Sequence, residues 1–163
     1  MDPIESMPPI ARRDARTLVL GTMPGVASLE AQRYYAHPRN AFWGIMSTTF
    51  GFDLELTFPQ RYQELRNARV AVWDVLRRCQ RQGSLDSNIR DEHPNDFAAF
   101  FARHNQIDRV LLNGGYARQL FRRYVQAPDG VEVFALPSTS PANARMRFDE
   151  KLAAWQGALL RSV

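Results

Sequence analysis

Residues 17–25, Thr-Leu-Val-Leu-Gly-Thr-Met-Pro-Gly, decide the fold because they place a buried strand directly before a tight turn. The run from Thr17 to Leu20 is short, continuous and mostly apolar, which is typical of a parallel strand covered on both faces. Gly21 to Gly25 then allow a turn whose backbone N–H groups can face a ligand. A plain connection from a strand to a helix needs the same glycines, so the turn alone does not specify a function.

Three further runs have the same character, at residues 70–73, 110–112 and 131–136. Between them, apolar residues recur at helical spacing. The apolar faces expected for four helices are Phe42, Trp43 and Met46 within 40–50; Phe97, Phe100 and Phe101 after an Asn95 cap; Tyr116, Leu120, Phe121 and Tyr124; and Phe148, Leu152, Trp155 and Leu159. Strands that alternate with helices predict an α/β fold, a three-layer sandwich with a short parallel sheet.

The 163 residues fit a single domain spanning 1–163, and a hydrophobic fraction of 45% supplies enough side chains for a core. We expect residues 1–15 to form a loosely held N-terminal arm. The sequence has no apolar run long enough to cross a membrane and no apolar stretch typical of a secretion signal, so we expect a cytoplasmic protein without a membrane partner. The single cysteine, Cys79, excludes an intrachain disulfide and a cysteine-clustered metal site.

Arginine carries almost all of the positive charge, since Lys151 is the only lysine among 21 basic residues and the formal net charge is +4. A GC-rich genome produces such a bias through codon usage alone, whereas arginine also makes bidentate contacts with phosphate. The charge is therefore compatible with nucleic-acid binding but does not establish it.

Ligands of open α/β sheets bind outside the carboxyl ends of the strands. This rule directs attention to residues 21–25, 74–88, 113–115 and 137–146, which are rich in glycine, proline, serine and asparagine. None of these segments carries the glycine fingerprint of a dinucleotide site or of a P-loop, which removes the usual support for those functions.

The segment 34–43, Tyr-Tyr-Ala-His-Pro-Arg-Asn-Ala-Phe-Trp, gathers polar and aromatic side chains just before an expected helix. Pro38 disfavours the helical region for His37, so the segment forms a shaped loop. Asn40 could cap the helix, with the aromatic residues in the core, or it could present its amide to a ligand. Local chemistry leaves both interpretations open.

Three other segments carry polar groups that also have two interpretations. Asp74 could orient a ligand or cap a turn. Asn113 could read the edge of a heterocycle through paired hydrogen bonds, or it could cap the helix that follows. The hydroxyl residues at 138–140 suit phosphate contacts, and the Arg-Met-Arg sequence at 145–147 could enter a duplex.

In this order, the segments GTMPG, YYAHPRNAFW, DVL followed by GSLDS, NGG and LPSTSPANA resemble the hypoxanthine-DNA glycosylase branch of the uracil-DNA glycosylase superfamily, over residues 17–155. The resemblance implies an α/β/α sandwich around a four-stranded parallel sheet. It also implies a monofunctional DNA glycosylase of base excision repair. Such an enzyme flips out a deaminated base, hypoxanthine preferred, and leaves an abasic site.

The resemblance also assigns residues. Relatives that act on uracil have an acidic or amide residue inside the first turn, where this chain has Thr22 and Met23, so the catalytic asparagine is expected at Asn40, with His37 helping to stabilise the leaving base. The expected base pocket is Gly21, Thr22, Met23, Pro24, Gly25, Tyr35, Phe42, Asp74 and Asn113. The expected DNA contacts are Arg39, Ser138, Thr139, Ser140, Asn143, Arg145 and Met146, with the wedge among the last three.

The expected partner is double-stranded or single-stranded DNA that contains deaminated bases, and we expect a monomer without cofactor or metal, near the nucleoid of a prokaryotic cell. Strand cleavage through a Schiff base needs an amine, and Lys151 is expected on the last helix, away from the strand-end loops. Two alternatives remain: a uracil- or mismatch-specific DNA glycosylase, and a non-catalytic nucleic-acid-binding α/β module.

Overall fold

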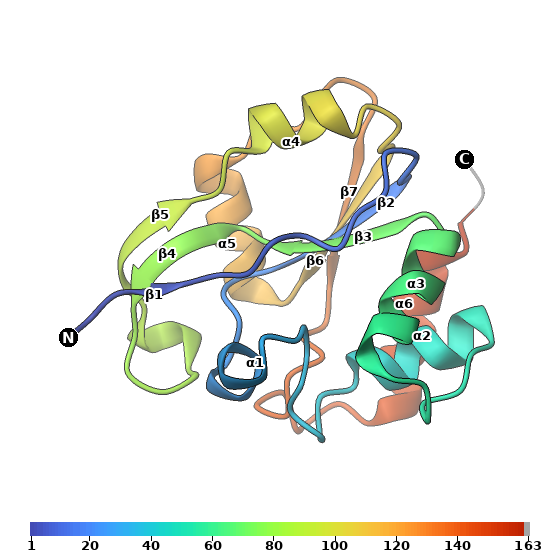
Figure 1. The fold of residues 1–163 in the computed structure, drawn as a ribbon, viewed down its shortest axis with the longest axis horizontal. Coiled ribbons are helices and arrows are strands. Elements are labelled where there is room, and N and C mark those ends of the chain that lie inside the picture. Colours follow the sequence, from blue (N-terminus) through green and yellow to red (C-terminus); the bar gives the residue numbers. More distant parts are fainter. Residues whose placement is uncertain (162–163) are drawn as a thin grey trace.

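A sheet of four parallel strands forms the centre of the computed structural model, which describes residues 1–161 (Figure 1). The order across the sheet is β3-β2-β6-β7, and each strand pairs in register with its neighbour. The strands are β2 (Thr17–Gly21), β3 (Val70–Asp74), β6 (Arg109–Asn113) and β7 (Glu132–Leu136). All four were predicted from their apolar runs to within one residue at each end.

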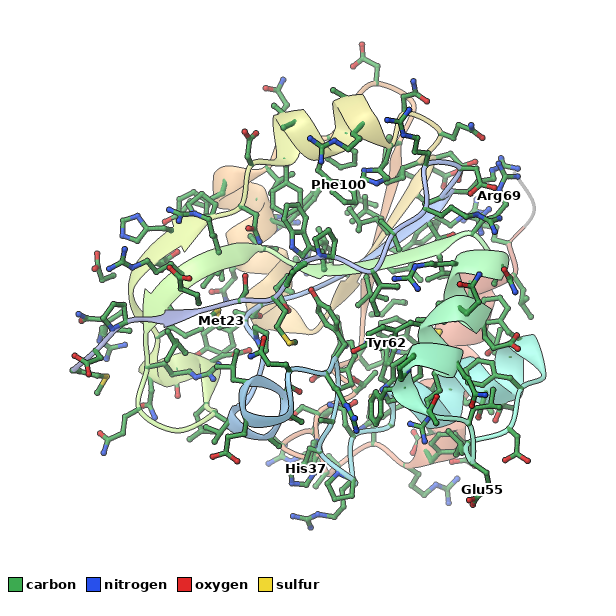
Figure 2. All side chains as sticks on the ribbon, in the orientation of Figure 1. Met23, His37, Glu55, Tyr62, Arg69 and Phe100 are labelled. Atoms are coloured by element: carbon green, nitrogen blue, oxygen red, sulfur yellow. The ribbon has the colours of Figure 1, made fainter. Side chains whose placement is uncertain are left out.

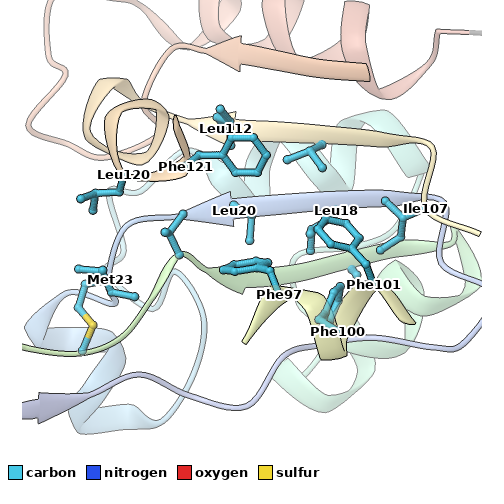
Figure 3. Packing of buried hydrophobic residues seen from close by; sticks show 14 of the residues in the cluster. Leu18, Leu20, Met23, Phe97, Phe100, Phe101, Ile107, Leu112, Leu120 and Phe121 are labelled. Atoms are coloured by element: carbon cyan, nitrogen blue, oxygen red, sulfur yellow. The ribbon is translucent and has the colours of Figure 1, made fainter. Parts of the chain in front are cut away.

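Helices cover both faces of the sheet, which confirms the sandwich. Because successive side chains of a strand point to opposite faces, Leu18 and Leu20 join one apolar cluster while Val19 joins the other. The first cluster contains the aromatic face of α4 (Phe97–Arg103) and the apolar face of α5 (Gly115–Tyr124), as Figure 3 shows. The second cluster contains residues of α2 (Phe42–Phe50), α3 (Phe58–Asn67) and α6 (Phe148–Leu159).

A second, antiparallel sheet of order β1-β4-β5 extends the molecule beyond β3 (Figure 1). Its strands are β1 (Ile4–Glu5), β4 (Leu76–Gln80) and β5 (Arg90–Pro94). The prediction of a loosely held arm at residues 1–15 is wrong, because β1 pairs with β4 and Met7 and Ile10 are buried. Two apolar side chains and a strand pairing hold the N-terminal segment on the body.

The expected helices are present with small differences in their surfaces. Asp96, not Asn95, caps α4 by accepting a hydrogen bond from Ala99 N. Tyr116 and Tyr124 of α5 and Phe148 of α6 are exposed, although they were expected to face the core. Within residues 1–161, no helix is both long and apolar enough to cross a membrane.

Candidate active site at the carboxyl ends of the strands

Gly21 lies where the ends of β2 and β3 meet, directly opposite Asp74 in the strand register. A Cβ atom at position 21 would lie 2.5 Å from Asp74 Oδ1 and 3.2 Å from Tyr35 Oη. Only a glycine leaves room for these two polar groups to approach the backbone. The turn predicted from the sequence therefore allows a carboxyl group and a phenol to meet at one point.

The carboxyl group of Asp74 is buried and lacks a hydrogen-bond partner. The residue is 4% exposed, and its Oδ2 makes no hydrogen bond within the described residues. Its backbone is held in place, because Asn95 Nδ2 donates to Asp74 O at 2.8 Å. Burial raises the pKa of Asp74 to about 7. The nearby Asp86 carboxylate adds to this shift, and the positive charge of Arg81 opposes it.

The loop after β4 packs against the first turn. Arg81 Nη2 donates to Pro24 O at 2.7 Å, its Nε donates to Gly83 O at 2.7 Å, and Ser84 Oγ accepts from Val26 N at 2.9 Å. Sequence reasoning did not assign Arg81 or Ser84 to the site. The GSLDS segment at 83–87 was the available signal, but it did not show which side chain turns inward.

Asp86, from the same loop, is a second acidic group beside the turn. Burial raises the pKa of this carboxyl, and a hydrogen bond with the Thr22 side chain opposes the shift. Thr22 itself is 5% exposed. Two carboxyl groups and few compensating charges thus border the same small region.

Tyr35 connects this region to the surface. Its backbone has φ +53°, an uncommon conformation for a residue with a side chain, and its ring stacks on Phe42 with a centroid distance of 4.1 Å. Its hydroxyl accepts a hydrogen bond from Asn113 Nδ2 at 3.2 Å. Phe42 is fully buried, so it supports Tyr35 from behind and is not open to a ligand.

Asn113 clamps the loop after β7. Its Nδ2 donates to Thr139 Oγ1 at 2.9 Å, and its Oδ1 accepts from Thr139 N at 2.9 Å. Gly114, with φ +96°, packs so closely that a Cβ would lie 3.1 Å from Ser138 Cβ. The amide expected to read a base edge is therefore used by the protein to hold the segment expected to bind phosphate.

The loop from 138 to 147 is also held by its own hydrogen bonds. Ser138 Oγ accepts from Ser140 N, Ser140 Oγ accepts from Ala142 N, and Asn143 Nδ2 donates to Ser138 O, each at 3.1 Å. Because each serine oxygen accepts from the backbone, its O–H remains able to donate to an anion. Arg145 is exposed at the end of this loop.

A cleft of about 660 Å³ lies between this loop and the segment that joins α1 (Val26–Ala31) to α2. The two walls are tied together, because Ala41 N donates to Thr139 O at 2.9 Å. Figure 2 shows His37 at this edge of the molecule. The predicted site residues that line the cleft are Tyr35, His37, Arg39, Asn40, Asn143 and Met146.

Asn40 is half-buried in the cleft wall, and its Oδ1 accepts from Phe42 N at 3.0 Å. The structural role considered for this residue is therefore real, although Ala41 is the N-cap residue of α2. A carbonyl oxygen accepts two hydrogen bonds, so one acceptor position of Oδ1 remains. Its Nδ2 makes no hydrogen bond to another residue of the described chain.

His37 lines the cleft, and one of its ring nitrogens has a partner in the chain. Its Nδ1 accepts from Arg39 N at 3.1 Å. In the neutral imidazole the proton is then on Nε2, which makes Nε2 a donor. Arg39 itself is exposed beside it.

Lys151 does not lie away from the strand-end loops, as was expected from the sequence. It contributes to the cleft wall, is 5% exposed, and its Nζ lies 3.5 Å from Ser140 O. Burial lowers its pKa. The prediction failed because the helical pattern of α6 did not reveal that the loop after β7 folds back over this residue.

The expected residues thus form two adjoining groups. Asn40, His37, Arg39, Asn143 and Met146 surround the open cleft, whereas Gly21, Thr22, Met23, Pro24 and Asp74 are buried behind Tyr35. Across residues 1–161, no three His, Cys, Asp or Glu side chains cluster in a way that could hold a metal ion.

Comparisons with known proteins agree on one family. The sequence model of the Uracil DNA glycosylase superfamily matches residues 8–159. A protein from Methanosarcina barkeri named Hypoxanthine DNA glycosylase is 30% identical over 158 residues, which cover 96% of this chain and 98% of the relative. A protein of the same name from Methanosarcina acetivorans is 32% identical over 142 residues, covering 85% of this chain and 87% of that one.

A solved structure shares the fold as well. The solution NMR structure of a candidate uracil DNA glycosylase from Methanosarcina acetivorans superposes with a TM-score of 0.81 at 28% identity, and the match covers 97% of each chain.

Proposed function

Because the chain belongs to the uracil DNA glycosylase superfamily, we propose that it excises hypoxanthine from deoxyinosine in DNA and leaves an abasic site. The enzyme is a DNA glycosylase, a hydrolase of N-glycosidic bonds, and its substrate is DNA. The observation that carries the proposal is the cleft in which Asn40 and His37 face the hydroxyl-rich loop, directly in front of the strand ends.

Asn40 is proposed to position the attacking water. Breaking the bond between C1′ and the base builds positive charge on the sugar, so an oriented water needs no strong base to attack. The free acceptor position of Asn40 Oδ1 suits this task, while its bond to Phe42 N keeps the side chain in one orientation. His37 Nε2 is a donor that can stabilise the leaving base.

Ser138 and Ser140 are proposed to hold the phosphates beside the extruded nucleotide, through hydroxyl groups whose oxygens are already oriented by backbone donors. Arg39 and Arg145 are exposed and supply positive charge. Met146 lines the cleft, and the exposed Arg145 directly precedes it in the chain, so either side chain is a candidate to fill the gap that the flipped base leaves.

Hypoxanthine is preferred over uracil in this proposal. The two curated relatives carry the name Hypoxanthine DNA glycosylase, and the first turn of this chain has Thr22 and Met23 where an acidic or amide residue would serve uracil. Because the solved relative is described as a candidate uracil DNA glycosylase, uracil is the second substrate to test.

The test uses matched duplexes with a single hypoxanthine, uracil or xanthine, followed by alkaline cleavage of abasic sites. We expect hypoxanthine to be released fastest. Faster release of uracil would overturn the preference, and binding without release of any base would favour a non-catalytic DNA-binding module.

The enzyme is proposed to be monofunctional. Lys151 is the one lysine of the sequence, and although it contributes to the cleft wall, its Nζ is directed at Ser140 O, 3.5 Å away. Borohydride should trap no covalent adduct with deoxyinosine DNA, and an adduct that disappears in Lys151→Arg would contradict this. We also propose that the protein is a monomer in a prokaryotic cell, acting on nucleoid DNA, and light scattering tests the monomer.

A further inference from the structure

Asp74 is a buried acidic group whose contacts do not explain its presence. Its Oδ2 is buried without a hydrogen-bond partner among residues 1–161, and the residue is almost fully enclosed. Such a group costs folding free energy. In a native structure it calls for an explanation, and an unpaired buried carboxyl at strand ends is a candidate functional group.

The charged and titratable groups around Asp74 favour its neutral form. Among residues 1–161, Arg81 is the cation that acts on it; its Nε and Nη2 donate to Gly83 O and Pro24 O, its Nη1 has no hydrogen-bond partner, and it forms no ion pair with Asp74. Asp86 opposes ionisation as a like charge. Tyr34 and Tyr35, the remaining titratable neighbours, have pKa values raised by burial and so stay uncharged. Asp74 therefore holds a proton up to about neutral pH.

Asp74 does not itself line the open cleft, but its carboxyl adjoins Tyr35, which does. Tyr35 lines the cleft, and its hydroxyl borders the same point of Gly21 as Asp74 Oδ1 does. A purine that enters along the ring of Tyr35 would bring its edge to the carboxyl. Asn113 does not compete for this role, because its amide is bonded to Thr139 and Tyr35.

We propose that protonated Asp74 is the general acid that delivers a proton to the departing purine. The inference rests on the proposed function and adds a catalytic residue to it. As the bond between C1′ and N9 breaks, its electron pair passes to the base, and the proton of Asp74 moves to a ring nitrogen. Hypoxanthine leaves neutral, water adds its oxygen to C1′, and the proton lost by that water returns through solvent to the carboxylate.

The chemistry explains why the enclosed site is useful. A carboxyl whose proton is held near neutral pH is an effective acid under working conditions, as in glycosidases that protonate their leaving group. A purine anion is a poor leaving group in a low-dielectric site. Delivery of a proton therefore lowers the barrier to base release further than hydrogen-bond donors alone would.

The test compares the parent enzyme with Asp74→Asn in single-turnover release of hypoxanthine between about pH 5.5 and about pH 9. We expect the parent rate to fall as pH rises through neutrality, because the active form is protonated. Asp74→Asn should be slower by about a hundredfold or more at low pH and should lose this dependence. Asp129→Asn, a change in an exposed loop, is the matched control and should behave as the parent.

A second substrate separates acid catalysis from other roles of Asp74. In 7-methyldeoxyinosine the purine already carries a positive charge, so at the low end of the pH range, where N1 keeps its proton, 7-methylhypoxanthine leaves neutral without receiving a proton. Compared there, Asp74→Asn should release it at close to the parent rate after spontaneous loss is subtracted. An equal loss on both substrates, or a variant with the parent rate and pH profile, would overturn the inference. Failure of the parent to release hypoxanthine would instead overturn the proposed function.

Discussion

At the scale of single residues, Gly21 and Asp74 form a close contact that a one-atom change should break. A Cβ at position 21 would meet Asp74 Oδ1 at 2.5 Å, so Gly21→Ala must displace the carboxyl or the strand end. We expect a loss of about 1–3 kcal/mol in the free energy of unfolding. Gly157→Ala is the control: it lies in α6 with open space around it, and it should stabilise the protein by about 0.5–1 kcal/mol. Urea denaturation measures both, and equal effects would contradict the packing described here.

The raised pKa of Asp74 predicts how stability depends on pH. The folded protein holds this proton up to about pH 7, whereas the unfolded chain releases it near the ordinary value of 3.8. This contribution to stability is therefore complete below the unfolded pKa and is lost as pH rises through about 7. Asp74→Asn carries no charge at any pH, so it should reduce the decline between pH 5 and pH 8 by roughly 2–4 kcal/mol. Chemical denaturation at the two pH values measures it, and an unchanged decline would contradict the burial of an unpaired carboxyl.

At the scale of elements, the loop after β7 depends on one side chain of β6. Asn113 makes two hydrogen bonds with Thr139, one in each direction. Asn113→Ala removes both and should weaken binding of deoxyinosine DNA by about tenfold, since a net loss of about 1.4 kcal/mol corresponds to that factor. Asn105→Ala, in the exposed turn after α4, is the control and should bind as the parent does. Fluorescence anisotropy gives the affinities. Parent-like binding by Asn113→Ala would contradict the proposal that Asn113 holds the loop in its DNA-binding conformation.

The elements themselves were largely predictable from the sequence, and the reason for each failure is physical. Strands β2, β3 and β6 have continuous apolar runs because both of their faces are covered, whereas β7 at the edge of the sheet is partly exposed although its run is apolar. Strands β4 and β5 are rich in charged residues and have exposed faces, so no apolar pattern marked them. The site was predictable as a set of strand-end segments, but the inward turn of Arg81 and Asp86 and the burial of Lys151 depend on loops that fold back over them.

At the scale of the whole molecule, Arg39 is exposed at the cleft and Arg145 is exposed on the loop after β7, which predicts salt-dependent binding of DNA. Counterions are released when phosphates are neutralised, so the logarithm of affinity should fall linearly with the logarithm of salt concentration. Arg145→Ala should reduce that slope by about 1 if its guanidinium contacts a phosphate. Ser138→Ala and Ser140→Ala should weaken binding without changing the slope, because they remove no charge. A flat salt dependence of the parent would contradict phosphate binding at this loop.

The role of Asn40 is the central claim, because the residue has a structural bond to Phe42 N and a proposed part in the reaction. Loss of the structural bond alone would cost about 0.5–2 kcal/mol of stability and leave the chemistry of the folded protein intact. Asn40→Asp keeps an oxygen acceptor for Phe42 N, so it preserves this hydrogen bond and changes the chemistry of the group that orients water.

Single-turnover release of hypoxanthine by Asn40→Ala, measured with its thermal denaturation and its DNA affinity, tests this claim most directly. The account predicts a rate at least about a hundredfold below the parent, with melting temperature and affinity little changed. A folded, DNA-binding Asn40→Ala protein that releases hypoxanthine at close to the parent rate would contradict it.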